Sequence, residues 1–249
     1  MLIPATDCLY PQAMRLLSYN IHKCIGGRDR LYRPERVFRV IEHEAPDLIF
    51  LQEVDRNVPR SRGHDQAAMF AEHFGFAHVF QLNHKLKQGG YGNLILSRWP
   101  IAEHHHLSLR FRNKKVRGAQ VVRIESPCGP LRLVNWHLGL SDRERQWQVA
   151  HLLSHPAYRA LDGLPTIIAG DFNDWRNALC VGSLCGPSWR HLTAPPSRFR
   201  SFPAWLPVGS LDKAFACERI RLERAHTVGS MLARKASDHL PLVLDFEIA

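Results

Sequence analysis

The sequence predicts an α/β protein in which β-sheets pack together and helices lie outside them. Short apolar runs that suit β-strands recur along most of the chain, whereas few stretches show helical spacing. No low-complexity linker divides the chain, and its 249 residues are within the range of one large domain. We therefore expect residues 1–14 to form a loose lead-in and residues 15–249 to form a single domain.

The first half of the chain is predicted to contain two helices among its strands. Val37, Val40 and Ile41 recur at helical spacing after Pro34, a residue that suits the first turn of a helix. A second helical pattern ends at Gly75. The predicted strands, of which the last two form a hairpin, are residues 15–21, 47–54, 77–82, 92–101, 119–126 and 131–138.

The second half is predicted to contain one long helix and further strands. Ser141 and Glu144 have the spacing of a capping box at the start of a helix over residues 141–161. Residues 176–207 are rich in Pro, Ser and Trp and are expected to be mostly loop. The predicted strands are residues 167–169, 210–216, 224–228 and 240–248.

Composition narrows the classes of protein that fit. The net charge of +10, from 33 basic and 23 acidic residues, attracts polyanions such as nucleic acid, anionic membrane headgroups or phosphorylated small molecules. The densest basic run, residues 111–118, is expected to be a loop between strands. No apolar stretch approaches the roughly 20 residues of a transmembrane helix, and no secretory signal is evident. We expect a cytoplasmic protein and predict no protein partner.

Cysteine and histidine runs offer alternative metal sites. The six cysteines are scattered and form no C-x-x-C pair, which favours reduced thiols. Cys180 and Cys185 could bind a metal, but their spacing is a poor match to known zinc sites. His104 to His106 could bind a transition metal, or they could form a solvated strand edge.

Polar side chains recur where apolar strands end, which indicates a site lined by neighbouring strand ends. Their oxygen ligands suit magnesium or manganese far better than zinc. Taken singly, Asp171 and Asn173 could instead form an Asx turn, and His137 could be an ordinary half-buried histidine. The residues concerned are Asn20, Glu53, His137, Asp171, Asn173 and Asp212, with Asp238 and His239 just before the last strand.

Seven motifs resemble, in order and approximate spacing, those of the endonuclease/exonuclease/phosphatase superfamily. They are SYNIHK, DLIFLQEV, GYGNLILSRWPI, NWHL, GDFND, GSLDKAF and ASDHLPL, and they extend from about Arg15 to Glu247. The resemblance implies a four-layer α/β sandwich, in which two packed mixed β-sheets are flanked by helices. It also implies metal-dependent hydrolysis of phosphate esters, as in deoxyribonucleases, abasic-site endonucleases, inositol-phosphate phosphatases and neutral sphingomyelinases.

The resemblance further implies a metal centre and an activated water. Glu53 would be the main ligand of a Mg²⁺ or Mn²⁺ ion, with Asn20 beside it and Asp238 close by. Asp171 would orient and deprotonate the attacking water, and Asn173 would hold water or a phosphate oxygen.

The same resemblance implies contacts to the substrate. His239 would contact the scissile phosphate, held in orientation by Asp212. His137 would hydrogen-bond the phosphate and assist the leaving group. Tyr91 would also bind substrate, although the glycines beside it could instead serve a tight turn.

Two positions depart from the superfamily pattern. His22 stands where abasic-site endonucleases tend to carry an acid, which puts a second metal ligand there in doubt. Lys213 follows Asp212 where many relatives have an aromatic residue; it could add positive charge near the phosphate or point to solvent.

Three functions remain open on the sequence. A nuclease is favoured, because basic charge suits phosphate backbones and Trp136, Trp175, Trp189 and Trp205 could stack on bases. A phosphodiesterase or phosphatase acting on lipid headgroups or soluble phosphates is the alternative, in which residues 197–209 could touch a membrane or be a packed loop. The third is an inert binding module, which would have no chemical need for the full set of site residues.

Overall fold

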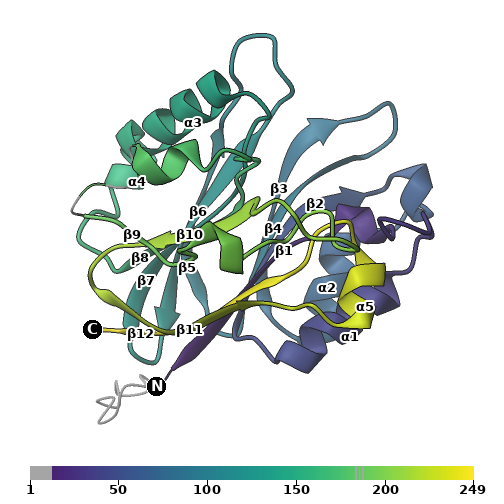
Figure 1. Cartoon of the computed structure of the whole chain (residues 1–249), viewed down its shortest axis with the longest axis horizontal. Coiled ribbons are helices and arrows are strands. Elements are labelled where there is room, and N and C mark those ends of the chain that lie inside the picture. The colour runs from purple at the N-terminus through teal and green to yellow at the C-terminus, as the bar shows by residue number, and fades with distance from the viewer. Residues whose placement is uncertain (1–12, 183, 185, 187) are drawn as a thin grey trace.

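Two six-stranded mixed β-sheets pack face to face, and helices cover their outer faces (Figure 1). The computed structural model describes residues 13–182, 184, 186 and 188–249. The predicted four-layer α/β sandwich is therefore confirmed. The expected lead-in falls largely on residues 1–12, which lie outside the described residues, and the first strand begins at Met14.

Each sheet contains one parallel pair of strands, β1–β2 in the first sheet and β7–β8 in the second. In order across the first sheet, the strands are β11 (Ile220–Thr227), β12 (Leu242–Ile248), β1 (Met14–Asn20), β2 (Leu48–Arg56), β4 (Gly90–Ser97) and β3 (Ala77–Lys85). Across the second sheet they are β5 (Ile101–Ser108), β6 (Gly118–Ser126), β7 (Gly129–His137), β8 (Thr166–Asp171), β10 (Asp212–Ala216) and β9 (Arg190–His191).

The helices divide between the two outer faces. The first sheet is covered by α1 (Pro34–Glu44), α2 (Gln66–Phe74) and α5 (Met231–Ala236). The second sheet is covered by α3 (Asp142–Ser154) and α4 (Pro156–Arg159). Short 3₁₀ turns, which serve as connectors, are η1 (His22–Cys24), η2 (Pro59–Ser61), η3 (Ala178–Val181) and η4 (Pro196–Arg198).

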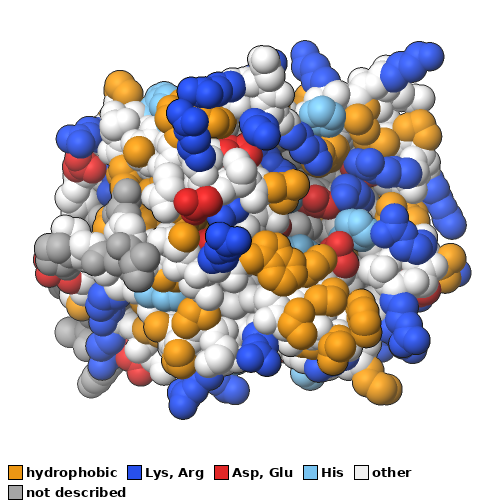
Figure 2. Space-filling view, turned by 45° about the horizontal axis from the view of Figure 1, so that its top comes forward, with side chains coloured by type: hydrophobic (Ala, Val, Ile, Leu, Met, Phe, Trp, Pro, Cys, Tyr) orange, Lys and Arg blue, Asp and Glu red, His pale blue; other side chains and the backbone are white. Residues whose placement is uncertain are grey.

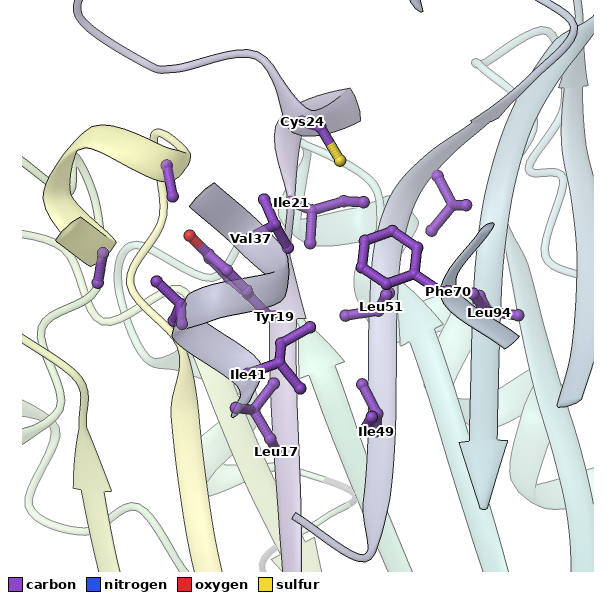
Figure 3. Packing of buried hydrophobic residues seen from close by; sticks show 14 of the residues in the cluster. Leu17, Tyr19, Ile21, Cys24, Val37, Ile41, Ile49, Leu51, Phe70 and Leu94 are labelled. Atoms are coloured by element: carbon purple, nitrogen blue, oxygen red, sulfur yellow. The ribbon is translucent and has the colours of Figure 1, made fainter. Parts of the chain in front are cut away.

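Apolar side chains fill each of the three layer boundaries. Figure 3 shows Ile41 of α1 and Phe70 of α2 over the strand residues Leu17 and Leu51. Between the sheets lies a second cluster, which includes Phe50. Because each fully buried Leu, Ile or Phe contributes roughly 1.5–3 kcal/mol, these clusters hold the strand ends in fixed positions.

Three predicted elements differ from the structure. Pro156 divides the expected helix over residues 141–161 into α3 and α4, because proline has no amide hydrogen to continue a helix. Ser141 precedes α3 as predicted, but its side chain makes no capping hydrogen bond. The expected strand 92–101 ends at Ser97, and β5 begins at Ile101. Helix α5 was not predicted.

Other predictions from composition have clear outcomes. His104 to His106 lie on β5, an edge strand, and alternate between exposed and half-buried, so the solvated-edge alternative is correct. Cys185 lies outside the described residues, so the Cys180–Cys185 alternative has no structural test. Among the described residues, no helix is long and apolar enough to cross a membrane.

Candidate active site

The predicted site residues come together at one end of both sheets. β7 and β8 run parallel and end on His137 and Asp171, which are paired in register. Asp212, the first residue of β10, is paired with Asp171 from the other side. Asn20 ends β1 in the opposite sheet, and its amide donates to Asp171 Oδ2 over 3.0 Å. The site therefore spans the two sheets.

Gly170 gives β8 the backbone conformation that positions Asp171 beside His137 and Asp212. Its φ of +144° is one that other residues rarely adopt. A Cβ atom here would lie 2.1 Å from the carbonyl oxygen of Trp136, on the paired strand β7. Only glycine therefore fits.

The two carboxylate oxygens of Asp171 serve different purposes. Oδ1 accepts a hydrogen bond from the amide of Asn173 over 2.9 Å, so the Asx turn is present. Oδ2 lies 3.3 Å from His137 Nε2 and 3.8 Å from His239 Nε2. Burial raises the pKa of Asp171 to about 6, even though His239 opposes the shift. A buried carboxylate with a pKa near neutrality can accept a proton efficiently.

Asp212 and His239 are 27 positions apart in sequence and in contact in the structure. His239 Nδ1 lies 2.8 Å from Asp212 Oδ2, and both side chains are buried. Burial alone would lower the pKa of His239, but the Asp212 and Asp171 carboxylates outweigh it and raise the pKa to about 10. The imidazole is therefore held as a cation at neutral pH, with Nε2 turned toward Asp171.

The pKa of His137 is shifted in the opposite direction from that of His239. Burial lowers its pKa well below the ordinary value, and the positive charge of Arg117 lowers it further. The ring is therefore neutral at neutral pH. A neutral imidazole can donate a hydrogen bond to a phosphate oxygen, but it is a poor source of a proton for a leaving group.

The sequence suggested that the strand ends at Glu53, but in the structure it does not. β2 continues to Arg56, and its register with β4 shifts between Leu51 and Val54. Glu53 lies in this bulge with a φ of +58°. Bulges re-aim side chains and occur beside active sites, and this one directs the carboxylate toward the strand ends.

The Glu53 carboxylate already holds a cation in the structure. Lys23 Nζ donates to Glu53 Oε2. Burial would raise the pKa of Glu53, but the charge and hydrogen bond of Lys23 outweigh it and lower the pKa overall, so Glu53 is ionised at neutral pH. The ammonium group marks a position where positive charge is favoured, and the carboxylate oxygen that it contacts is a hard donor of the kind that suits Mg²⁺ or Mn²⁺.

The other two predicted ligands are near His22. Asn20 Oδ1 accepts from the His22 amide over 3.1 Å, and Asp238 Oδ2 lies 3.8 Å from His22 Nε2. A separate compact group consists of Asp171, Asp212 and His239, whose ligand atoms lie within 4.8 Å of one another.

Asn173, Asp174 and Lys213 hold the loop after β8 in place. The side-chain Nδ2 of Asn173 donates to the Leu138 carbonyl over 3.0 Å. Asp174 accepts from the amides of Ala178 and Leu179. Lys213 is fully buried, and its ammonium donates to the carbonyls of Asp174 and Ser210. The alternative in which Lys213 points to solvent is therefore wrong, whereas a contribution of positive charge near the phosphate stays a prediction.

Tyr91 is buried near the site among basic side chains. The ammonium groups of Lys23 and Lys115 lie 5.8 and 5.1 Å from its ring centroid, and the Arg60 guanidinium lies 5.3 Å away. The tight-turn alternative is correct for Gly89, which has a φ of +69° between β3 and β4. Gly92 lies within β4, where a Cβ would lie 1.7 Å from the Gln81 carbonyl oxygen.

The tryptophans differ in their exposure. Trp136 is fully buried, which excludes it from base stacking, and Trp189 is half-buried. Trp175 and Trp205 are each 53% exposed. Trp175 contacts Phe202, whose ring centroid is 4.9 Å from that of His239, so these aromatic residues border the site.

Basic side chains are abundant on the face that includes the upper end of Figure 1. Figure 2 shows Lys and Arg spread over this face around a gathering of hydrophobic side chains. Exposed hydrophobic residues in the loop after η4 are Trp205, Leu206 and Val208. The predicted segment 197–209 is thus partly exposed and partly packed, because Phe199 and Ala204 are buried.

Sequence reasoning missed residues that hydrogen-bond to the strands below the site and so hold them in place. Ser237 Oγ donates to the Asn20 carbonyl over 2.7 Å. The side chain of Gln52 donates to Asn135 Oδ1 over 2.8 Å and so joins the two sheets below the site. Lys23 was also missed, although it stands within the SYNIHK motif beside Asn20.

Comparison with known proteins agrees with this fold. Uncharacterized protein YbhP of Escherichia coli strain K12 is 25% identical over 249 residues, which cover 95% of this chain and 97% of that protein. The crystal structure of an endonuclease/exonuclease/phosphatase from Beutenbergia cavernae is 23% identical, with a TM-score of 0.81, over 95% of this chain and 72% of that chain. The mannosyl-6-phosphatase Bt3783 of Bacteroides thetaiotaomicron is 15% identical, with a TM-score of 0.74, over 94% and 99%.

A family model described as the Endonuclease/Exonuclease/phosphatase family matches residues 17–239, which is most of the chain. Proteins of this superfamily typically hydrolyse phosphate esters. The chain belongs to the endonuclease/exonuclease/phosphatase family.

Proposed function

We propose that this protein is a Mg²⁺- or Mn²⁺-dependent phosphodiesterase that acts on nucleic acid. The observation that carries the proposal is the buried series formed by Asp171, His239 and Asp212, in which a carboxylate of raised pKa faces an imidazolium held by a second carboxylate. This arrangement offers a base for water and a fixed positive charge for a phosphate within one compact group of side chains.

In the proposed mechanism, Asp171 Oδ2 takes the proton of the attacking water. Its pKa of about 6 lets it remain ionised at neutral pH and still accept a proton in the reaction. His239 donates a charge-assisted hydrogen bond from Nε2 to a phosphoryl oxygen, and Asp212 fixes its ring. His137 adds a neutral hydrogen bond, and Asn173 is proposed to hold water or a phosphate oxygen.

Glu53, Asn20 and Asp238 would hold the divalent metal ion. When bound, the ion would offset negative charge on the phosphoryl oxygens, which otherwise repel an attacking hydroxide. The ionised state of Glu53 and its contact with the Lys23 ammonium support this assignment, because both favour a cation at this carboxylate.

The net charge of the protein and its exposed aromatic side chains favour nucleic acid as the substrate. A net charge of +10 favours a polyanion, since phosphate contacts release bound counterions. Trp175 borders the site and exposes about half of its surface, as a base-stacking residue must.

A lipid or headgroup phosphodiester is the second candidate. Trp205, Leu206 and Val208 are exposed by 53%, 57% and 57%, and aliphatic side chains have no use in base stacking. Such a loop tip suits shallow insertion into a bilayer surface. The mannosyl-6-phosphatase named above has a similar fold, so a phosphomonoester is also a reasonable substrate to test.

A substrate panel in the presence of magnesium tests the proposal. It should contain duplex DNA, single-stranded DNA, RNA, phospholipid vesicles, a sugar phosphate and bis(p-nitrophenyl) phosphate. We expect turnover of a nucleic acid at a rate well above that of the lipid and the monoester. Preferential turnover of the vesicles would favour the second candidate, and no turnover of any phosphate ester would favour an inert binding module.

A further inference from the structure

The basic run 111–118 lies in the loop between β5 and β6, at the same end of the molecule as the candidate active site (Figure 1). Two of its cations lie near residues of the site: Lys115, which is exposed, and Arg117, which is buried. Lys115 Nζ lies 5.1 Å from the centroid of the Tyr91 ring. The positive charges of Arg117 and Lys115 both lower the pKa of His137, in agreement with a position near that site residue.

Arg117 is buried without a counter-ion. Its residue is 6% exposed, and its Nε has no hydrogen-bond partner. Among residues 13–182, 184, 186 and 188–249, no carboxylate oxygen lies within 4.0 Å of the Arg117 guanidinium or the Lys115 ammonium. A buried and unpaired guanidinium is costly unless an anion completes its hydrogen bonds.

A cleft lies beside these cations. Its volume is about 230 Å³, and it lies between the β5–β6 loop and residues 139–141, which closely follow His137. Lys114, Lys115 and Arg117 line it together with one acid, Glu144. The lining therefore carries an excess of positive charge.

Two other basic residues near the Tyr91 ring are paired with acids. Arg60 binds the Asp55 carboxylate through two hydrogen bonds, and Lys23 is paired with Glu53. Of these three cations by the Tyr91 ring in the described part of the chain, Lys115 of the β5–β6 loop is thus the one without an acidic partner.

We propose that Lys115 and Arg117 form a second anion subsite, which binds a phosphate group neighbouring the scissile phosphate in a nucleotide substrate. The guanidinium supplies planar paired donors that match phosphate, and the ammonium supplies a point charge. The proposal rests on the proposed function and specifies its substrate: a phosphodiester that carries a second phosphate is preferred over one that lacks it.

The test compares the dinucleotides TpT, pTpT and TpTp with magnesium. Each charge-assisted hydrogen bond to the additional phosphate should raise kcat/KM by roughly tenfold to a hundredfold, so we expect pTpT or TpTp to exceed TpT by at least tenfold. Lys115→Met and Arg117→Met should each reduce that preference ratio toward one. Arg112→Met is the matched control, because the Arg112 guanidinium lies over the Phe111 ring in the same loop, and its ratio should equal that of the parent.

Several results would overturn the subsite. They are equal kcat/KM values of the parent for all three dinucleotides, an unchanged ratio in Lys115→Met, or an equal loss of ratio in Arg112→Met. Lys115 is exposed, so its variant keeps the test valid if Arg117→Met fails to fold.

Failure of the proposed function is a separate outcome. If the parent hydrolyses none of the dinucleotides, the affinities for pTpT, TpTp and TpT are measured by calorimetry without metal. Tighter binding of a terminally phosphorylated dinucleotide that is lost in Lys115→Met supports the subsite even then, and equal affinities refute it.

Discussion

Replacing Asp212 with Asn tests whether Asp212 and His239 act as one unit. The substitution keeps the shape of the side chain and removes its charge. The pKa of His239 is raised from 6.5 to about 10, and each pKa unit corresponds to about 1.36 kcal/mol, so the surroundings, with the effect of burial included, favour the imidazolium by on the order of 5 kcal/mol. Asp212 at 2.8 Å contributes more of this than Asp171 at 3.8 Å.

The expected loss of turnover follows from that figure. A group that supplies a positioned proton or charge typically contributes 10²–10⁴-fold, which is about 3–5 kcal/mol of transition-state stabilisation. We therefore expect Asp212→Asn to lower kcat by roughly 10²–10⁴-fold with a smaller effect on KM. The alkaline limb of the rate profile should also move to lower pH, because His239 would lose its proton more readily.

The assay is a double-variant cycle on kcat with a soluble phosphodiester. His239→Ala should lose at least as much rate as Asp212→Asn, and the double variant should lose little more than His239→Ala, because residues that act together are not additive. Thermal melts control for misfolding. If the two single losses multiply in the double variant, or if the alkaline limb stays in place in Asp212→Asn, the two residues do not work together.

Four further predictions address the metal, the base, the charge and the backbone. Glu53→Gln should raise the Mg²⁺ concentration needed for half-maximal rate while leaving the melting temperature nearly unchanged; an unaltered metal requirement would remove Glu53 from the ligand set. The rate should fall below pH 6 as Asp171 (pKa about 6) gains a proton, and it should fall again above pH 10 as His239 (pKa about 10) loses one. A rate that stays constant from pH 5 to 11 would contradict both assignments. Affinity for DNA should fall steeply between low and physiological salt, and an unchanged affinity would argue for a lipid or small phosphate ester. Gly170→Ala should destabilise the fold by more than about 2 kcal/mol in urea unfolding, because its Cβ would overlap the Trp136 carbonyl; a neutral result would show that β7 can move away.

Much of the fold was predictable because its strands and helices have strong local patterns. The apolar runs of β1, β2, β7 and β8 are buried on both faces, and α1 begins at Pro34 as expected. The ends of strands and helices were harder to predict. The end of β4 at Ser97 and the division at Pro156 depend on how neighbouring segments pack, and periodicity does not report this.

The site was predictable as a set of residues, and less so in its chemistry. The contact of Asp212 with His239 followed from the family resemblance and is present in the structure. The bulge at Glu53, the neutral state of His137 and the burial of Lys213 depend on tertiary surroundings that one sequence does not contain. Arg117 shows the same limit: its basic run is evident in the sequence, but its burial beside the site is not.

The central claim is that Asp171 activates water for metal-dependent hydrolysis of a phosphodiester. The most direct measurement is the initial rate of bis(p-nitrophenyl) phosphate hydrolysis during a Mg²⁺ titration, for the parent and for Asp171→Asn, with melts to control for folding. We predict that the parent rate rises with Mg²⁺ and returns to background after chelation, and that Asp171→Asn loses at least about a hundredfold at saturating Mg²⁺. A parent rate that survives exhaustive chelation, or an Asp171→Asn variant as active as the parent, would contradict the claim.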